Sequence, residues 1–274
     1  MTHWDQQAKK WEKIGPPLKP SSIDIQNHLS WIKTFNETFL HPLNVLILGV
    51  TPELINMPWP QKSTLYALDN NKKMLDLVLP KETSTIKPIG INGDWLVSPF
   101  KNQSFDMVLG DGCFSLIHQE NYARLLKEIH RILKPNGMFI MRFFIRPSQN
   151  ESLAMIHDDL KNGSLTNFHV FKFRIAMALH TDLSLGISLK KVWNCWHDYF
   201  KSDVLNLLKT LNWHDEEIDT INHYKDSDVH YTFPTQSEIE ALLSQHFIQK
   251  DLFIPGYYFG ERFPTFKLFP KVSA

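Results

Sequence analysis

One glycine and three aspartates follow short apolar segments of the sequence and could together form a nucleotide site. The apolar segments end at Gly49, Asp69, Asp94 and Asp111. In an open α/β sheet, ligands bind beyond the carboxyl ends of the parallel strands, so these residues would gather at one edge. Asp69 lies 20 residues after Gly49, a spacing at which an acidic side chain accepts hydrogen bonds from ribose hydroxyls. The spacing predicts a ligand that contains adenosine.

The loop after Gly49 restricts which adenosine compound would bind. A dinucleotide places its pyrophosphate at the N-terminus of the next helix, where free N–H groups and no negative charge are needed. Pro52 removes one N–H group and Glu53 adds a carboxylate, which argues against NAD. The same segment also suits a plain helix start, because Thr51 can cap, Pro52 fits the first turn and Glu53 favours the positive dipole end. A ligand loop and a simple helix cap both stay open.

Candidates for proton transfer lie at and after the fourth apolar segment. Asp111 and His118 are possible general bases in the segment that would line a cleft. The alternatives are a helix-capping aspartate and a solvated or core histidine. Both residues are therefore carried as candidate catalytic groups.

Alternating strands and helices over residues 40–146 would position these side chains. Apolar runs predict strands at residues 44–49, 64–68, 87–92, 105–109 and 138–145. An amphipathic helix is predicted before the fifth strand, because apolar side chains recur there at three- to four-residue spacing before Pro135 and Gly137. These apolar residues are Tyr122, Leu125, Leu126, Ile129, Ile132 and Leu133. The order implies right-handed crossovers and a doubly wound, mostly parallel α/β sheet.

The remaining segments predict a single domain built around this core. Residues 147–233 read as a helical insertion or lid, with one helix over 189–211. Thr235 and Glu238 form a capping box for a helix over 235–245, and strands are expected at 247–254 and 264–269, with an antiparallel strand at the C-terminus. The predicted parts of the domain (1–274) are an N-terminal helical arm (1–35), a cofactor-binding core (36–146), the insertion (147–233) and a C-terminal block (234–274).

The ordered motifs of the core resemble those of class I S-adenosylmethionine-dependent methyltransferases. LILGVTPEL is similar to a variant of the family's first motif, YALDNNKKML to the second and NGDW to the third. SFDMVLGDG and EIHRILKPNGMFIMR resemble the fourth strand, its helix and the fifth strand. The resemblance implies a Rossmann-like fold, S-adenosyl-L-methionine as cofactor and S-adenosyl-L-homocysteine as product. It implies that Asp69 binds the ribose and that Asp94 and Trp95 meet the adenine.

The first motif departs from the usual family pattern at Ile47, Thr51 and Glu53, where an acid and two glycines are common. Because the cofactor has no phosphate, a glycine-poor loop with an acid is tolerable. We hypothesise that Glu53 attracts the cofactor's ammonium, while the Thr51 hydroxyl or nearby N–H groups bind its carboxylate. The full predicted cofactor set is Gly49, Thr51, Glu53, Asp69, Asn70, Asp94, Trp95, Asp111 and Gly112.

The insertion and the arm suggest how an acceptor would be enclosed. Large rings in the insertion could line a lid over a small, aromatic or partly apolar acceptor, or could form the insertion's own core. These rings are Trp193, Trp196, Tyr199, Phe200, Trp213, Tyr224 and Tyr231. In the arm, Trp4 and Trp11 would share one helix face, which either closes over the cofactor or packs on the sheet. Methyl transfer itself is an in-line displacement from the sulfonium that depends mainly on positioning.

Composition excludes several other classes of protein. Lys and Arg total 29, as do Asp and Glu, so the balanced charge disfavours a nucleic-acid partner. No uninterrupted apolar stretch of about 18 residues occurs, so we expect a cytoplasmic, soluble protein with no membrane partner. The two cysteines have no metal-binding spacing, and no metal is expected. A protein that binds the cofactor without transfer activity, and a nucleic-acid or protein methyltransferase, stay as alternatives; the oligomeric state is open.

Overall fold

A seven-stranded sheet forms the centre of the computed structural model, which describes residues 8, 11–39, 41–165 and 167–271. Its strand order is β3-β2-β1-β4-β5-β9-β8. Strands β1 to β5 pair in parallel, whereas β9 runs antiparallel to both β5 and β8. This topology confirms the predicted α/β sheet with an antiparallel strand near the C-terminus. The strands are β1 (Asn44–Leu48), β2 (Thr64–Asp69), β3 (Ile89–Asn92), β4 (Phe105–Asp111), β5 (Leu133–Arg142), β8 (Phe247–Phe253) and β9 (Thr265–Pro270).

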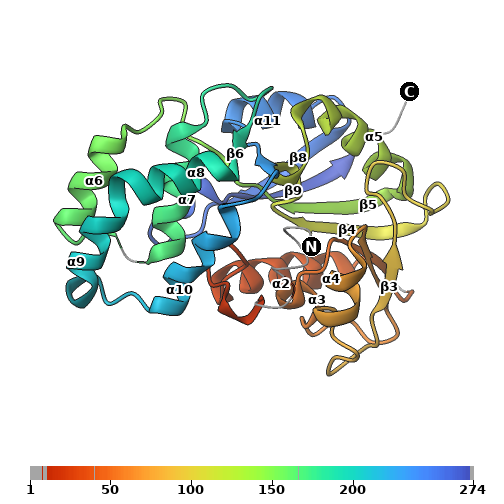
Figure 1. Cartoon of the computed structure of the whole chain (residues 1–274). Coiled ribbons are helices and arrows are strands. Elements are labelled where there is room, and N and C mark those ends of the chain that lie inside the picture. Colours follow the sequence, from red (N-terminus) through yellow and green to blue (C-terminus); the bar gives the residue numbers. More distant parts are fainter. Residues whose placement is uncertain (1–7, 9–10, 40, 166, 272–274) are drawn as a thin grey trace.

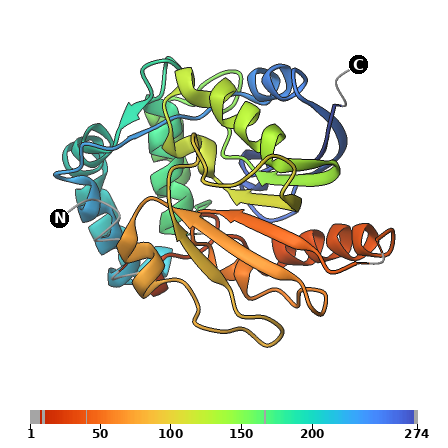
Figure 2. The same cartoon turned by 90° about the vertical axis from the view of Figure 1, so that its right-hand side faces the viewer.

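Helices cover both faces of this sheet (Figures 1 and 2). The central strand β1 shows why its sequence is continuously apolar: Val45 and Ile47 pack with Trp31 in one apolar cluster, and Leu46 and Leu48 belong to another. Both clusters exclude water from the strand, as in parallel sheets generally. One face carries α2 (Ser22–Asn36), α3 (Pro52–Ile55) and α4 (Lys72–Leu77), and the other carries α5 (Tyr122–Ile132) and α11 (Gln236–Leu243).

Two predicted boundaries differ from the structure. We expected a turn at residues 134–137, but β5 already begins at Leu133, opposite Phe105, and the register shifts before the Met107–Met138 pair. The extra residues are taken up as a bulge, where Pro135 needs no ladder hydrogen bond. The predicted helix over 189–211 is divided into α8 (Leu189–Cys195), a π-helical turn (Trp196–Phe200) and α9 (Lys201–Leu211).

The capping box is confirmed at the start of α11. The Thr235 side chain accepts a hydrogen bond from the Glu238 N–H, and the Glu238 carboxylate accepts one from the Thr235 N–H at 2.6 Å. Such reciprocal bonds satisfy two N–H groups that a helix start would otherwise leave unpaired.

The insertion lies beside the carboxyl edge of the sheet and has its own core (Figure 1). Its central helix, α7 (Phe168–Leu179), is buried along residues 168–177, as expected for a helix enclosed by others. Two short paired strands in it were not predicted from the sequence. The elements are α6 (Leu153–Lys161), α7 (Phe168–Leu179), β6 (Ile187–Ser188), α10 (Asp215–Asp219), a 3₁₀ turn (Thr220–Tyr224) and β7 (His230–Tyr231), in addition to α8 and α9. No helix in the described ranges is long and apolar enough to cross a membrane.

Candidate functional site

A cavity of about 250 Å³ lies at the carboxyl edge of the sheet, between the sheet, the arm and the insertion. Eight of the nine predicted cofactor residues line it: Gly49, Thr51, Asp69, Asn70, Asp94, Trp95, Asp111 and Gly112. The ends of β1, β2 and β4, and the turn after β3, therefore bring these residues together, as the topology requires. Glu53 and His118 are not part of this lining.

Gly49, Asp69 and Trp95 form one compact corner of the cavity. Gly49 has a φ of +83°, and a Cβ at this position would lie 3.3 Å from the Trp95 ring and 3.8 Å from Asp69 Oδ2. The Trp95 indole N–H donates to the Leu68 carbonyl at 2.7 Å, which fixes the ring beside the glycine. The residue type at position 49 therefore keeps space open where the backbone turns out of β1.

The Asp69 carboxylate has the surroundings expected of a ligand-binding acid. Its Oδ1 accepts a hydrogen bond from the Asn71 N–H at 2.7 Å, and the residue is 8% exposed. Burial raises the pKa of Asp69 to about 6, so the group is ionised at neutral pH but costly to keep dry. Hydroxyl donors from a ribose would replace the lost hydration.

The other predicted residues differ in how they meet the cavity. Asp94 is exposed, and its Oδ1 accepts from the Leu96 N–H at 2.9 Å, so the carboxylate also stabilises its own turn. Thr51 is the N-cap residue of α3, but its side chain makes no capping hydrogen bond. Gly112 has a φ of +64°, and a Cβ there would meet the Phe144 ring at 2.7 Å. Close approach of Phe144 to the loop thus depends on this glycine.

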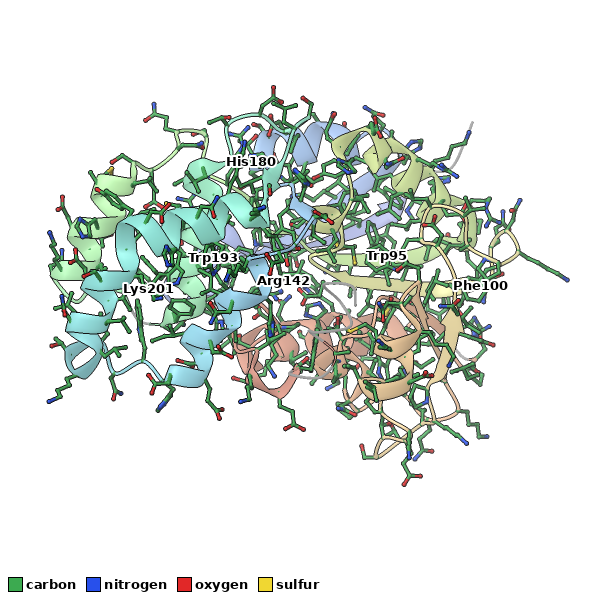
Figure 3. The ribbon with its side chains drawn as sticks, viewed as in Figure 1. Trp95, Phe100, Arg142, His180, Trp193 and Lys201 are labelled. Atoms are coloured by element: carbon green, nitrogen blue, oxygen red, sulfur yellow. The ribbon has the colours of Figure 1, made fainter. Side chains whose placement is uncertain are left out.

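Asp111 is engaged in a buried ion pair at the base of the cavity. Arg142 Nε donates to Asp111 Oδ1 at 2.6 Å, and both terminal nitrogens of Arg142 donate to the Pro17 carbonyl at 3.0 Å. Burial raises the pKa of Asp111 to about 6, against the opposing effect of the Arg142 charge, so the carboxylate is ionised at neutral pH. Figure 3 shows Arg142 near the centre of the molecule, between the sheet and the insertion. The pair joins β4, β5 and the arm.

Glu53 and His118 do not line the cavity. Glu53 pairs with Lys19 of the arm, with its Oε1 3.0 Å from the lysine Nζ. His118 is exposed, and its ring centroid lies 6.3 Å from that of His230. The other oxygen of Glu53, Oε2, is buried and has no hydrogen-bond partner in the described part of the chain, and, in addition to burial, the Glu53 charge helps to raise the pKa of Asp111. The roles of Glu53 at the cofactor's ammonium and of His118 as a base stay predictions.

The arm closes one side of the cavity. Trp11, Ile14 and Leu18 line it, and the Gly15 N–H donates to His169 Nε2 of the insertion at 3.2 Å. Residues 11–18 thus cover the site, whereas the following helix α2 packs on the sheet. Trp4, the other tryptophan of the predicted pair, lies outside the described residues.

The insertion contributes residues that sequence analysis missed. Lys172 and Phe173 of α7 line the cavity, as does Thr220. Ser115, in the expected cleft segment after β4, also lines it, and its buried hydroxyl has no hydrogen-bond partner in the described part of the chain. One signal was present: FHVFKFRIAMAL places two cations in an otherwise apolar helix. Among the predicted rings, Trp196, Phe200 and Trp213 pack in the insertion's core and Tyr199 is exposed, whereas Tyr224 and Tyr231 both pack there and line the cavity.

Comparison with known proteins agrees with this geometry. A family model described as a methyltransferase domain matches residues 49–141. Demethylmenaquinone methyltransferases of two Staphylococcus epidermidis strains are 36% identical to the chain over 80 residues, 29% of this chain and 32% of each relative. The chain therefore spans about a third of the length of these curated relatives.

Solved structures support the fold. A Rhodobacter sphaeroides protein named provisionally as a zinc-dependent alcohol dehydrogenase has a TM-score of 0.55 at 13% identity, over 97% of this chain and 98% of that chain. The carbon methyltransferase CurJ has a TM-score of 0.53 at 11% identity, over 93% of this chain and 56% of that chain. At these identities the likeness shows the arrangement of elements and not the chemistry.

The strand-end residues and the doubly wound sheet form a site of the kind that binds adenosine compounds in α/β proteins. Residues 49–141 match a methyltransferase domain. This match implies S-adenosylmethionine as the cofactor of that domain. Among the residues described, no group of three or more His, Cys, Asp and Glu side chains could hold a metal ion.

Proposed function

We propose that the protein transfers a methyl group from S-adenosylmethionine to a small-molecule acceptor inside the cavity. The observation that supports this most is that one cavity is lined both by the strand-end residues and by rings of the insertion. Its volume of about 250 Å³ lies just below the usual range for small-molecule pockets, which favours a small acceptor over a macromolecular one. The Staphylococcus epidermidis relatives are named for demethylmenaquinone, also a small molecule.

The residues divide into a cofactor side and an acceptor side. Asp69 would hold the ribose, and Trp95 with Asp94 would contact the adenine, because these side chains lie at adjoining strand ends. Asp111 and Gly112 lie at the end of β4, between the two sides. S-adenosylmethionine supplies an electrophilic methyl group when it is bound. The acceptor side is formed by Phe144, Phe173 and Tyr231, among others.

Positioning and exclusion of water are the contributions that the chain can make to the reaction. The arm and the insertion cover the cavity from opposite directions, held by the Gly15–His169 and Arg142–Pro17 hydrogen bonds. A dry site that holds the acceptor close to the donor lowers the entropic part of the barrier. Asp111, fixed by Arg142, would keep the end of β4 in place. Proton removal by Asp111 or His118 stays a prediction.

Titration calorimetry with S-adenosylmethionine and S-adenosylhomocysteine tests the cofactor assignment. We expect both to bind to the wild type, Asp69→Asn to weaken both, and NAD not to bind. Asp76→Asn is the matched control, because Asp76 is an exposed acid of the nearby α4 that pairs with Lys72. Formation of S-adenosylhomocysteine in a screen of small aromatic acceptors would then establish transfer. Cofactor binding without turnover on any acceptor would favour a binding protein instead.

A further inference from the structure

Two cations lie in the buried helix α7, and only one of them is neutralised. Arg174 donates to Glu151 at 2.6 Å and lies 2.8 Å from an Asp159 oxygen. Lys172, two residues earlier, is 3% exposed and has no carboxylate within 4 Å in the described part of the chain. Because an uncompensated buried charge is strongly unfavourable, the lysine needs an explanation that packing of the insertion does not supply.

Lys172 lines the cavity and makes one hydrogen bond among the described residues. Its Nζ donates to Thr220 Oγ1 at 2.9 Å, and Thr220 in turn donates to the Glu217 carbonyl at 2.6 Å. An ammonium group has three donors, so this hydrogen bond uses one of them. The Tyr224 ring centroid lies 5.1 Å from Nζ. Both Lys172 and Thr220 line the cavity.

We propose that Lys172, oriented by its hydrogen bond to Thr220, binds an anionic oxygen of an aromatic acceptor, a phenolate or a carboxylate, at the insertion side of the cavity. This inference rests on the proposed function, since it names the acceptor class of the same site. The aromatic part of the acceptor would contact Phe144, Phe173 and Tyr231, which line the adjoining wall. Rings of this kind favour stacked or edge-on contact with another ring.

The charge pattern of the cavity supports this assignment. Asp69, Asp94 and Asp111 lie on the cofactor side, where the positive sulfonium and ammonium would be bound. Lys172 is the opposite charge on the acceptor side. Burial lowers the pKa of His169, next to Lys172, to about 3, so this histidine is neutral at neutral pH. Burial also lowers the pKa of Lys172 to about 7. A bound anion would favour the protonated form of the lysine.

Equilibrium binding of small aromatic probes tests the proposal on the whole protein. Benzoate and 4-nitrophenol are the anionic probes, and benzamide and nitrobenzene are their uncharged counterparts. Each is titrated with and without saturating S-adenosylhomocysteine into the wild type, Lys172→Met and Lys190→Met. Lys190 is an exposed lysine of α8, so its variant controls for loss of a positive charge. Ionised 4-nitrophenol absorbs at longer wavelength, which reports the bound form directly.

We expect at least one anionic probe to bind to the wild type about thirtyfold or more tightly than its uncharged counterpart, since truncating one partner of a buried charge pair costs at least this much. Lys172→Met should lose that preference while retaining S-adenosylhomocysteine, and Lys190→Met should keep it. Benzoate as the ligand would indicate aromatic acids, and the nitrophenolate would indicate phenols.

Equal affinity for charged and uncharged probes in the wild type would overturn the proposal. The same is true if Lys172→Met keeps the anion preference, or if neither anion binds at all. Failure of S-adenosylhomocysteine to bind would instead contradict the proposed function, and the titrations without it would still decide whether the anion site exists.

Discussion

Replacing Lys172 by methionine is expected to stabilise the folded protein at neutral pH. Burial lowers the pKa of this lysine from its usual 10.5 to about 7. Because each pKa unit corresponds to about 1.4 kcal/mol, keeping the buried ammonium at low pH costs the folded state roughly 5 kcal/mol. The folded-state pKa is the net result of burial and of the contacts with Thr220, Phe168 and Tyr224, so these contacts are not subtracted again. Lys172→Met should therefore be more stable than the wild type at pH 7 by roughly 2–4 kcal/mol.

The pH dependence of this difference identifies the lysine as its cause. In the unfolded chain the lysine keeps its proton up to about pH 10.5, whereas the folded protein releases it near pH 7. Between these values the unfolded state binds more protons, so the wild type becomes more stable as pH rises. From pH 7 to pH 9 the lysine adds roughly 2 kcal/mol to the free energy of unfolding of the wild type, and the variant lacks this rise.

Urea unfolding followed by tryptophan fluorescence at pH 7, 8 and 9 measures both effects. The groups facing the lysine do not interfere, because burial lowers the pKa of His169 to about 3 and raises that of Tyr231 to about 12, with Tyr224 also raised. Lys190→Met should parallel the wild type. If Lys172→Met also gave a parallel curve, or were less stable than the wild type at pH 7, the reasoning about an uncompensated ammonium would be refuted.

Two further predictions concern the cofactor corner and the C-terminal block. Binding of S-adenosylhomocysteine should weaken about tenfold from pH 7 to pH 5, because the ribose needs the ionised Asp69, whose pKa burial raises to about 6. Calorimetry should find no such dependence in Asp69→Asn, and an equally steep one there would assign it to another group. Thr235→Ala should lower the free energy of unfolding by about 1 kcal/mol through loss of the capping box at α11, as read from urea midpoints. An unchanged midpoint would mean that this cap contributes nothing to stability.

Local pattern was sufficient to predict the sheet and the corner around Asp69. Continuous apolar segments identify strands that are covered on both faces, and parallel strands must end at the same edge, so Gly49, Asp69 and Asp111 meet there whatever the rest of the chain does. The capping box at Thr235 is equally local. Residues 134–137, predicted as a turn, fall within β5, but they interrupt its pairing with β4, which is regular from the Met107–Met138 pair onward.

Contacts between distant segments were out of reach of the same reasoning. The sequence places Glu53 at a helix N-terminus, where the helix dipole favours an acid. Its ion-pair partner Lys19 belongs to the arm, and no sequence pattern relates the two residues. Likewise, Arg142 lies at the end of a predicted strand, but its hydrogen bonds to Pro17 depend on how the arm returns to the sheet. Such contacts follow from tertiary packing, which overrides local preference.

Helix α7 shows how a stability argument can separate a structural residue from a ligand-binding one. Arg174 and Lys172 have similar burial and belong to the same helix, so helix propensity and burial do not distinguish them. Arg174 has two carboxylates, and its removal would leave those acids unpaired; its charge is explained by the fold. Lys172 has no acidic partner among the described residues, and we expect it to lower stability at neutral pH. Residues that reduce stability are expected at sites where function requires them. For a buried cation at the wall of a cavity, the expected function is to bind an anion.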